Sequence, residues 1–98
     1  MVWHTVWFKF NEGVTDIQKQ EMLDGLNALP DSIDAIQTLA CGEDFAGRAP
    51  GYEVGLVVTF ETRAGLEEYG PHPYHQNFIA KFKPLWVDVL ALDFETPQ

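Results

Sequence analysis

The segment that decides the fold is the first one, Val2-Trp3-His4-Thr5-Val6-Trp7-Phe8-Lys9-Phe10. Most of its residues are β-branched or aromatic, which is typical of a strand, and it runs into Asn11-Glu12-Gly13, a turn signal. Alternate side chains of a strand point to opposite faces of the sheet. One face therefore carries Val2, Val6, Phe8 and Phe10, and the other carries Trp3 and Trp7. The pattern predicts a strand in a sheet that is apolar on both sides.

Three more strands are predicted, at residues 36–45, 52–60 and 86–94. The strand at residues 52–60 alternates regularly between apolar and other residues, and its apolar face is made of Tyr52, Val54, Leu56, Val58 and Phe60. The last is apolar on both faces, with Trp86, Leu90, Leu92 and Phe94 on one and Val87, Val89 and Ala91 on the other. Cys41, the one cysteine, falls in the second strand, where we expect a half-buried thiol.

Helices are predicted between these strands. Thr15 opens a capping box with Gln18, and apolar residues then recur at helical spacing at Ile17, Met22, Leu23, Leu26 and Leu29. Thr62 begins a short helix to about Tyr69, which Gly70-Pro71 interrupts. A further helical stretch, residues 71–82, carries Phe78, Ile79 and Phe82. The order β-α-β-β-α(α)-β predicts the α+β class: a ferredoxin-like, four-stranded antiparallel sheet with helices on one face.

The second face of this sheet would be left bare, because the helices can cover only one side. An exposed apolar patch of that size marks an interaction surface. A second copy of the same sheet is the simplest cover and would give a two-fold homodimer. A monomer with a few exposed large residues is the alternative.

Size and charge limit the classes of partner. The 98 residues suit a single domain over residues 1–98. A net charge of −9 with only six basic residues argues against a nucleic-acid partner, which would require neutralised phosphates. No apolar run is long enough for a transmembrane helix, and neither a disulfide pair nor a signal-peptide pattern is present. We therefore expect a cytoplasmic protein with no membrane partner.

The histidines are the candidates for chemistry. His4 lies in mid-strand, and His72 and His75 lie in Tyr69-Gly-Pro-His72-Pro-Tyr74-His75. A histidine can move a proton near neutral pH, and a tyrosine hydroxyl can hydrogen-bond the oxygen of a carbonyl substrate. Structural roles are equally open: His4 as a core histidine, Tyr69 as a packing residue, and His72 as a residue that caps or stiffens the turn before Pro73.

A metal site and a cofactor site are both disfavoured. His72 and His75 are three residues apart, a spacing that can serve one metal ion. However, Pro73 lies between them and no third ligand is marked by local spacing. The sequence also lacks a glycine-rich phosphate loop and a dinucleotide fingerprint. We expect no metal and no cofactor.

Several segments, in this order along the chain, resemble the Dabb (stress-responsive A/B barrel) family. They are the strand from His4 to Lys9-Phe10, Gly51-Tyr52 leading into Val57-Val58-Thr59-Phe60-Glu61, and the closing Val89-Leu90-Ala91-Leu92-Asp93-Phe94. The stretch from Tyr69 through His75 to Phe78 matches the family pattern Tyr-x-x-His-Pro-x-His. The resemblance covers nearly the whole chain.

The resemblance implies a subunit that pairs into a dimeric α+β barrel. It also implies possible enzyme activity, because a plant member of the family cyclises polyketides by aldol condensation without a cofactor. In such members the tyrosine and last histidine of the pattern form an acid–base pair, near the strand histidine; here these are Tyr69, His75 and His4. A further histidine of that enzyme has no counterpart, since Val54 takes its place.

The leading hypothesis is a small cofactor-free acid–base enzyme, cyclase- or lyase-like, that acts on a carbonyl or polyketide-like small molecule. His75 would be the base, Tyr69 the donor to the carbonyl oxygen, and His4 an orienting group, while His72 would shape the turn. Pocket walls are expected from Phe8, Leu26, Phe78, Phe82 and Trp86. The alternative is a non-catalytic dimeric stress-responsive protein that binds an apolar small ligand. Analogy of fold adds a cofactor-independent monooxygenase as a third possibility.

Overall fold

The structure is a computed structural model that describes residues 1–97. The sheet consists of β1 (Val2–Phe10), β2 (Ile36–Glu43), β3 (Val54–Phe60) and β4 (Trp86–Glu95). The helices are α1 (Asp16–Ala28), α2 (Arg63–Tyr69) and α3 (Pro73–Phe82), and short 3₁₀ turns at Leu29–Asp31 and Lys83–Leu85 follow α1 and α3. This order confirms the predicted ferredoxin-like arrangement. Among these residues, no helix combines the length and hydrophobicity that crossing a membrane requires.

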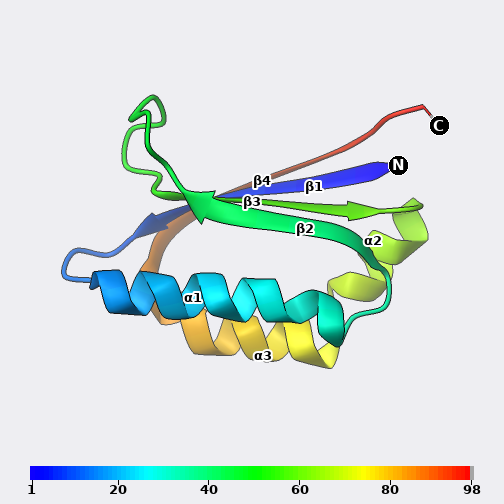
Figure 1. Cartoon of the computed structure of the whole chain (residues 1–98), viewed down its shortest axis with the longest axis horizontal. Helices are drawn as coiled ribbons and strands as arrows, with labels where there is room; N and C mark the ends of the chain where they lie inside the picture. Colours follow the sequence, from blue (N-terminus) through cyan, green and yellow to red (C-terminus); the bar gives the residue numbers. More distant parts are fainter. Residues whose placement is uncertain (98) are drawn as a thin grey trace.

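The strands are arranged β2-β3-β1-β4, and every neighbouring pair is antiparallel. Both α1 and α3 lie against the same face of the sheet, and α2 lies at the end of the sheet where β3 finishes (Figure 1). We call the helix-covered side the inner face and the other side the outer face.

The core fills the space between the inner face and the helices. Its buried side chains come mainly from the two central strands and from one stripe of each long helix: Val2, Val6, Phe8 and Phe10 of β1, Val54, Leu56, Val58 and Phe60 of β3, Met22, Leu23 and Leu26 of α1, and Phe78 and Phe82 of α3. Ile17, assigned to the same stripe from its spacing, is instead 73% exposed. It lies nine residues before Leu26, about two and a half turns, which places the two on opposite sides of α1.

The two faces of β4 differ from the predicted ones because the strand contains a β-bulge. Lys9 pairs with Asp88 but Phe10 pairs with Trp86, so Val87 is an extra residue on β4. The bulge reverses the alternation at that point. Trp86 therefore contacts Phe8 on the inner face, with ring centroids 4.8 Å apart. The prediction that Trp86 shares a face with Leu90, Leu92 and Phe94 is wrong.

Two further predicted boundaries differ from the structure, at the connection between β2 and β3. The connection covers residues 44–53, so β2 is shorter than predicted and β3 begins at Val54. The Asp44 carboxylate accepts a hydrogen bond from the Gly47 backbone N–H at 2.8 Å, which turns the chain away from the sheet. Gly47 and Gly51 both have positive φ, a conformation that glycine adopts readily.

The outer face remains apolar and exposed. Trp7, Leu90, Leu92 and Phe94 are each between 45% and 63% exposed. Trp3 stacks on Phe94 with ring centroids 6.1 Å apart, which continues the apolar surface toward the chain ends. No helix covers this face in the part of the chain that the structure describes (Figure 1).

The capping box of α1 gives a first testable prediction. The Gln18 backbone N–H donates to Thr15 Oγ1 at 3.1 Å, and the Thr15 N–H donates to Gln18 Oε1 at 2.9 Å. Thr62 precedes α2 in a similar extended conformation, but its side chain makes no capping hydrogen bond to the described residues. We expect Thr15→Ala to lower the free energy of unfolding by about 1 kcal/mol. Thr62→Ala is the matched control and should cost much less in the same urea titration; equal losses would contradict the assignment of the cap.

Candidate functional site

A cavity of about 170 Å³ lies between the inner face of the sheet and the helices. Its lining includes the three predicted acid–base residues, His4, Tyr69 and His75. The remaining lining is apolar and comes from Val6, Phe8, Leu26, Leu56, Phe78, Ile79, Trp86, Val89 and Ala91. The polar groups thus converge at one place in a largely apolar space, the usual composition of a small-molecule site.

The hydroxyl of Tyr69 is the most unusual group in this cavity. Tyr69 ends α2 and is 1% exposed, and its hydroxyl has no hydrogen-bond partner among the described residues. Burial raises the pKa of this hydroxyl to about 12, so it keeps its proton at physiological pH. An unsatisfied buried polar group costs about 1–3 kcal/mol, and buried hydroxyls are normally satisfied. A ligand that accepts a hydrogen bond in the cavity would satisfy it.

His75 is held in the tautomer that a base requires. Its Nδ1 lies 2.9 Å from the carbonyl oxygen of Gly70. A carbonyl oxygen only accepts hydrogen bonds, so Nδ1 carries the proton and the neutral ring keeps a free lone pair on Nε2. Burial lowers the pKa of His75, the hydrogen bond to Gly70 opposes that shift, and nearby His4 and His72 lower it further. His75 is therefore neutral at pH 7, with its ring centroid 4.1 Å from that of Tyr69.

His4 is oriented by a carboxylate that sequence reasoning did not single out. The Asp93 carboxylate hydrogen-bonds Nδ1 of His4, and the two residues face each other across β1 and β4. The imidazole stands edge-on to the Tyr69 ring, with centroids 5.7 Å apart. Because a carboxylate oxygen accepts hydrogen bonds, Nδ1 of His4 is the donor in this contact and Nε2 is the ring nitrogen that the contact leaves over. The pairing of the first and last strands could have suggested Asp93, but 89 residues separate it from His4.

His72 lies at the start of α3, beside the site and not among the residues that line it. It is the residue before the helix, and Pro73 follows in the first turn. Its Nδ1 accepts a hydrogen bond from the Tyr74 backbone N–H at 3.2 Å. His72 is thus the N-cap residue of α3. Within residues 1–97, no three side chains of His, Cys, Asp or Glu gather closely enough to hold a metal ion.

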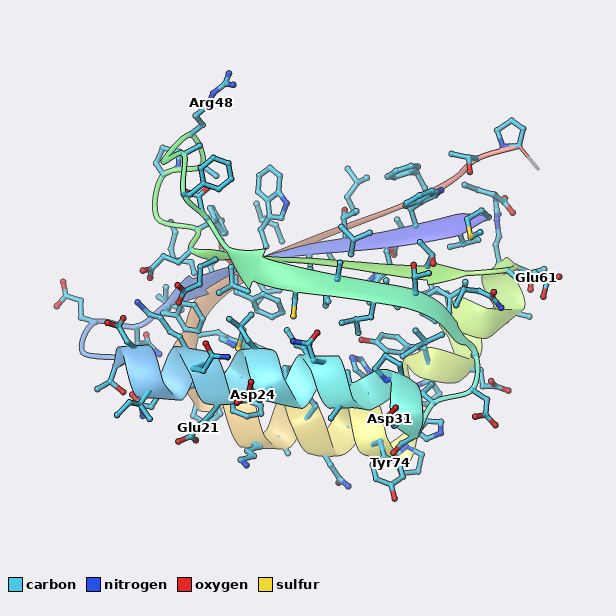
Figure 2. All side chains as sticks on the ribbon, viewed as in Figure 1. Glu21, Asp24, Asp31, Arg48, Glu61 and Tyr74 are labelled. Atoms are coloured by element: carbon cyan, nitrogen blue, oxygen red, sulfur yellow. The ribbon has the colours of Figure 1, made fainter. Side chains whose placement is uncertain are left out.

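Phe82 is the one predicted wall residue that lies outside the cavity. It lines a larger groove of about 600 Å³ between α1 and α3, together with Glu21, Asp24 and Tyr74. Those three side chains lie on the helix side of the molecule, away from the sheet (Figure 2). At Gly25 a Cβ atom would come within 2.9 Å of the Phe82 ring, so glycine lets the two helices approach closely. This groove contains none of the acid–base residues.

The cavity therefore combines one hydrogen-bond donor, the Tyr69 hydroxyl, with two potential acceptors, the Nε2 atoms of His75 and His4. Such a set can bind a carbonyl oxygen and remove a proton from a neighbouring atom. Sequence reasoning missed five apolar lining residues: Val6, Leu56, Ile79, Val89 and Ala91. Val89 and Ala91 pair with Phe8 and Val6 and share their inner face, and the bulge at Val87 places Trp86 on that face as well.

Comparisons with known proteins agree with this fold and extend over nearly the whole chain. Olivetolic acid cyclase from Cannabis sativa is 29% identical over 97 residues, which are 97% of this chain and 95% of that protein. A solved structure of a protein from Arabidopsis thaliana is 26% identical with a TM-score of 0.90, and the match covers 100% of this chain and 97% of that one. A dimeric ferredoxin-like protein from Thermobifida fusca is 27% identical with a TM-score of 0.87, covering 97% of this chain and 90% of that one.

The family pattern read from Tyr69 to Phe78 lies within a much longer match. The model of the family described as the stress responsive A/B barrel domain, Dabb, matches residues 2–96, so this chain belongs to the Dabb family.

Proposed function

We propose that this protein is a small, cofactor-free acid–base enzyme, cyclase- or lyase-like, that acts on a carbonyl compound. The observation that carries the proposal is the buried hydroxyl of Tyr69, which has no hydrogen-bond partner within residues 1–97 and lies in the same cavity as the unprotonated Nε2 of His75. Similarity over nearly the whole chain to a protein named olivetolic acid cyclase supports the same class of reaction.

The proposed reaction begins with enolisation. The substrate carbonyl oxygen accepts a hydrogen bond from the Tyr69 hydroxyl, while His75 Nε2 removes a proton from the adjacent carbon. The electron pair of that C–H bond moves to the carbonyl oxygen, where the hydroxyl stabilises the enolate. With a pKa of about 12, Tyr69 donates this hydrogen bond without losing its proton.

An enolate occurs in both the cyclase and the lyase variants, but it forms in a different way in each. In a cyclase, the enolate carbon attacks a second carbonyl of the same molecule, forming a C–C bond, and the new alkoxide takes the proton from His75. In a lyase, the steps run in reverse: His75 removes the proton of a β-hydroxyl group, the C–C bond breaks to give a carbonyl product and the enolate, and the enolate carbon takes the proton from His75. His4, held by Asp93 and edge-on to Tyr69, would keep the Tyr69 ring in position.

Tyr69→Phe tests this proposal, because the substitution should lower the rate of the reaction and raise the stability of the protein. We expect wild type to accelerate deuterium exchange at the α-carbon of acetone and acetophenone, followed by proton NMR in D₂O. Loss of the hydroxyl should lower that rate by about a hundredfold or more. Stability should rise by about 1 kcal/mol, because the substitution removes a buried hydroxyl that has no partner in the part of the chain that the structure describes.

Tyr52→Phe is the matched control. The Tyr52 hydroxyl donates to the Asp88 carboxylate outside the cavity, so its loss should leave the exchange rate unchanged. An unchanged rate in Tyr69→Phe would remove the donor role, and absence of exchange in wild type with every ketone tested would count against the enzyme.

A non-catalytic protein that binds an apolar ligand is the second candidate. The cavity walls favour it, because nine of the twelve lining residues are apolar aliphatic or aromatic side chains other than Tyr69. The two candidates differ in one measurement: a ligand-binding protein would bind ketones with no exchange at the α-carbon.

We further propose that two copies pair through their outer faces into a dimeric α+β barrel. The exposed Trp7, Leu90, Leu92 and Phe94 provide the apolar contact, and the similar protein from Thermobifida fusca is dimeric. We expect Leu92→Asp to convert a dimer to a monomer, because the carboxylate would lose its hydration in the interface. Ile17→Asp places the same charge on the exposed side of α1 and is the control. Light scattering after size exclusion gives the masses; two variants of equal mass would argue against this interface.

A further inference from the structure

We infer that the cavity accepts a compact carbonyl compound about the size of one six-membered ring and gives no buried space to a long alkyl chain. This inference rests on the proposed function, and it narrows the substrate class that the same site would take.

The volume of the cavity limits the size of the ligand. The cavity measures about 170 Å³. An engineered apolar cavity of about 150 Å³ holds one benzene molecule, whereas pockets for drug-sized ligands span about 300–1,000 Å³. One ring with a small carbonyl substituent therefore fills the space available here.

Packed aromatic rings line the cavity beside Trp86, the first residue of β4. The Trp86 ring lies 4.8 Å from that of Phe8 and 6.1 Å from that of Phe78, centroid to centroid. Phe8 and Phe78 are buried, as is Leu26 on the α1 side. Protein interiors are close-packed, so lengthening the cavity in this direction would require the core to rearrange. The ring faces themselves suit a planar ligand, which can stack or lie edge-on against them.

The polar residues of the cavity determine which functional group a matching ligand carries. Tyr69 supplies the single donor, and its hydroxyl lacks a partner among the described residues. His75 and His4 supply acceptors, since the proton on each Nδ1 is directed to the Gly70 carbonyl or the Asp93 carboxylate. A matching ligand has one acceptor beside an acidic C–H or O–H group. A one-ring ketone with an enolisable carbon has this combination.

The open side of the cavity lies at the edge strand β4. Val89 is 37% exposed and Ala91 is also exposed, and both line the cavity. Ile79 of α3, half-buried, lines it as well. An alkyl chain on the ligand would have to leave past these residues into water and would gain no buried area.

A series of phenyl ketones tests the inference: acetophenone, butyrophenone and hexanophenone, with dissociation constants from isothermal titration calorimetry. Burial of each added methylene would tighten binding about fourfold. For wild type we expect acetophenone to bind and hexanophenone to bind no more tightly. A steady fourfold gain per methylene would overturn the size limit while leaving the proposed function intact, provided that α-exchange of acetophenone persists. Failure of all three ketones to bind would overturn both.

Two variants alter the cavity from its open side, where the cost to folding is small. Ile79→Ala should enlarge it and make hexanophenone bind more tightly than acetophenone, whereas Ile17→Ala, the same change on the far side of α1, should have no effect. Ala91→Leu should fill the cavity and weaken acetophenone binding at least tenfold. Unchanged acetophenone affinity in a folded Ala91→Leu protein would overturn the inference.

Discussion

Replacing His75 by glutamine is expected to lower the rate of ketone α-proton exchange by about a hundred- to ten-thousand-fold, the usual contribution of a general base. Glutamine keeps a polar group at the site but has no basic nitrogen. The fold should tolerate the change, because the Gly70 carbonyl also accepts a hydrogen bond from Gln76 Nε2 at 2.7 Å. The lost rate would therefore report the missing base, with circular dichroism used to check that the variant is folded.

His72→Asn provides the matched control for that result. His72 precedes α3 and accepts a hydrogen bond from the Tyr74 N–H, and asparagine is a favoured residue at that capping position. We expect exchange within about twofold of wild type, because a cap contributes to helix stability and not to proton transfer. Equal losses in the two histidine variants would show that the signature is structural.

The pH dependence of the exchange rate should also show whether His75 is the base, and the direction of that dependence follows from its pKa. The base is the neutral form of His75, and burial lowers the pKa of this residue below its ordinary value of 6.5. The exchange rate should therefore rise with pH and reach its plateau at a lower pH than an exposed histidine would give. A midpoint of the profile at or above pH 6.5 would contradict a buried base, as would an identical profile in His75→Gln.

The elements predicted well from sequence are those whose signal is local. β1 was predicted with its observed bounds because most of Val2–Phe10 is β-branched or aromatic and the turn signal Asn11-Glu12-Gly13 follows it directly. The start of α1 was predicted from Thr15 and Gln18, which form their capping box within four consecutive residues. In both cases the residues that determine the element also lie inside it or next to it.

The features that sequence did not predict depend on pairing between distant strands. The bulge at Val87 can be located only from the register of β1 against β4, and it places Trp86 on the same face as Val89 and Ala91, so that all three line the cavity. The contact of Asp93 with His4 depends on the same register. One residue of slip in a strand exchanges its two faces, so spacing within β4 alone could not place these side chains.

The candidate site likewise has features that the sequence predicts and features that depend on the folded structure. The resemblance to a family placed Tyr69, His75 and His4 together, and the structure brings all three to one cavity. The lack of a partner for the Tyr69 hydroxyl could not be foreseen, because it depends on packing by Phe60 and His75 around the ring. The tautomer of His75 likewise depends on the position of the Gly70 carbonyl, which the helix break at Gly70-Pro71 sets.

The second large effect expected is on stability, from Phe60→Ala. Phe60 ends β3, is fully buried, and packs against the Tyr69 ring with centroids 5.3 Å apart. On its other side, a Cβ atom at Gly65 would lie only 3.1 Å from the Phe60 Cβ, so α2 packs closely on this residue. Truncation leaves a cavity that such close packing cannot collapse. We expect a loss of about 3–5 kcal/mol, a large fraction of the roughly 5–15 kcal/mol that stabilises a typical domain.

Phe45→Ala is the control for that loss, because the same side chain is truncated where it is 99% exposed. Its free energy of unfolding should stay within about 0.5 kcal/mol of wild type. Urea titrations followed by circular dichroism would give both values, with an unchanged slope as the sign that the same transition is being compared. Because Phe60 also supports the Tyr69 ring, the folded fraction of Phe60→Ala should exchange ketone protons more slowly than wild type. A variant that lost stability but kept its full rate would show that the Tyr69 ring is held in place by His4 and His75 without Phe60.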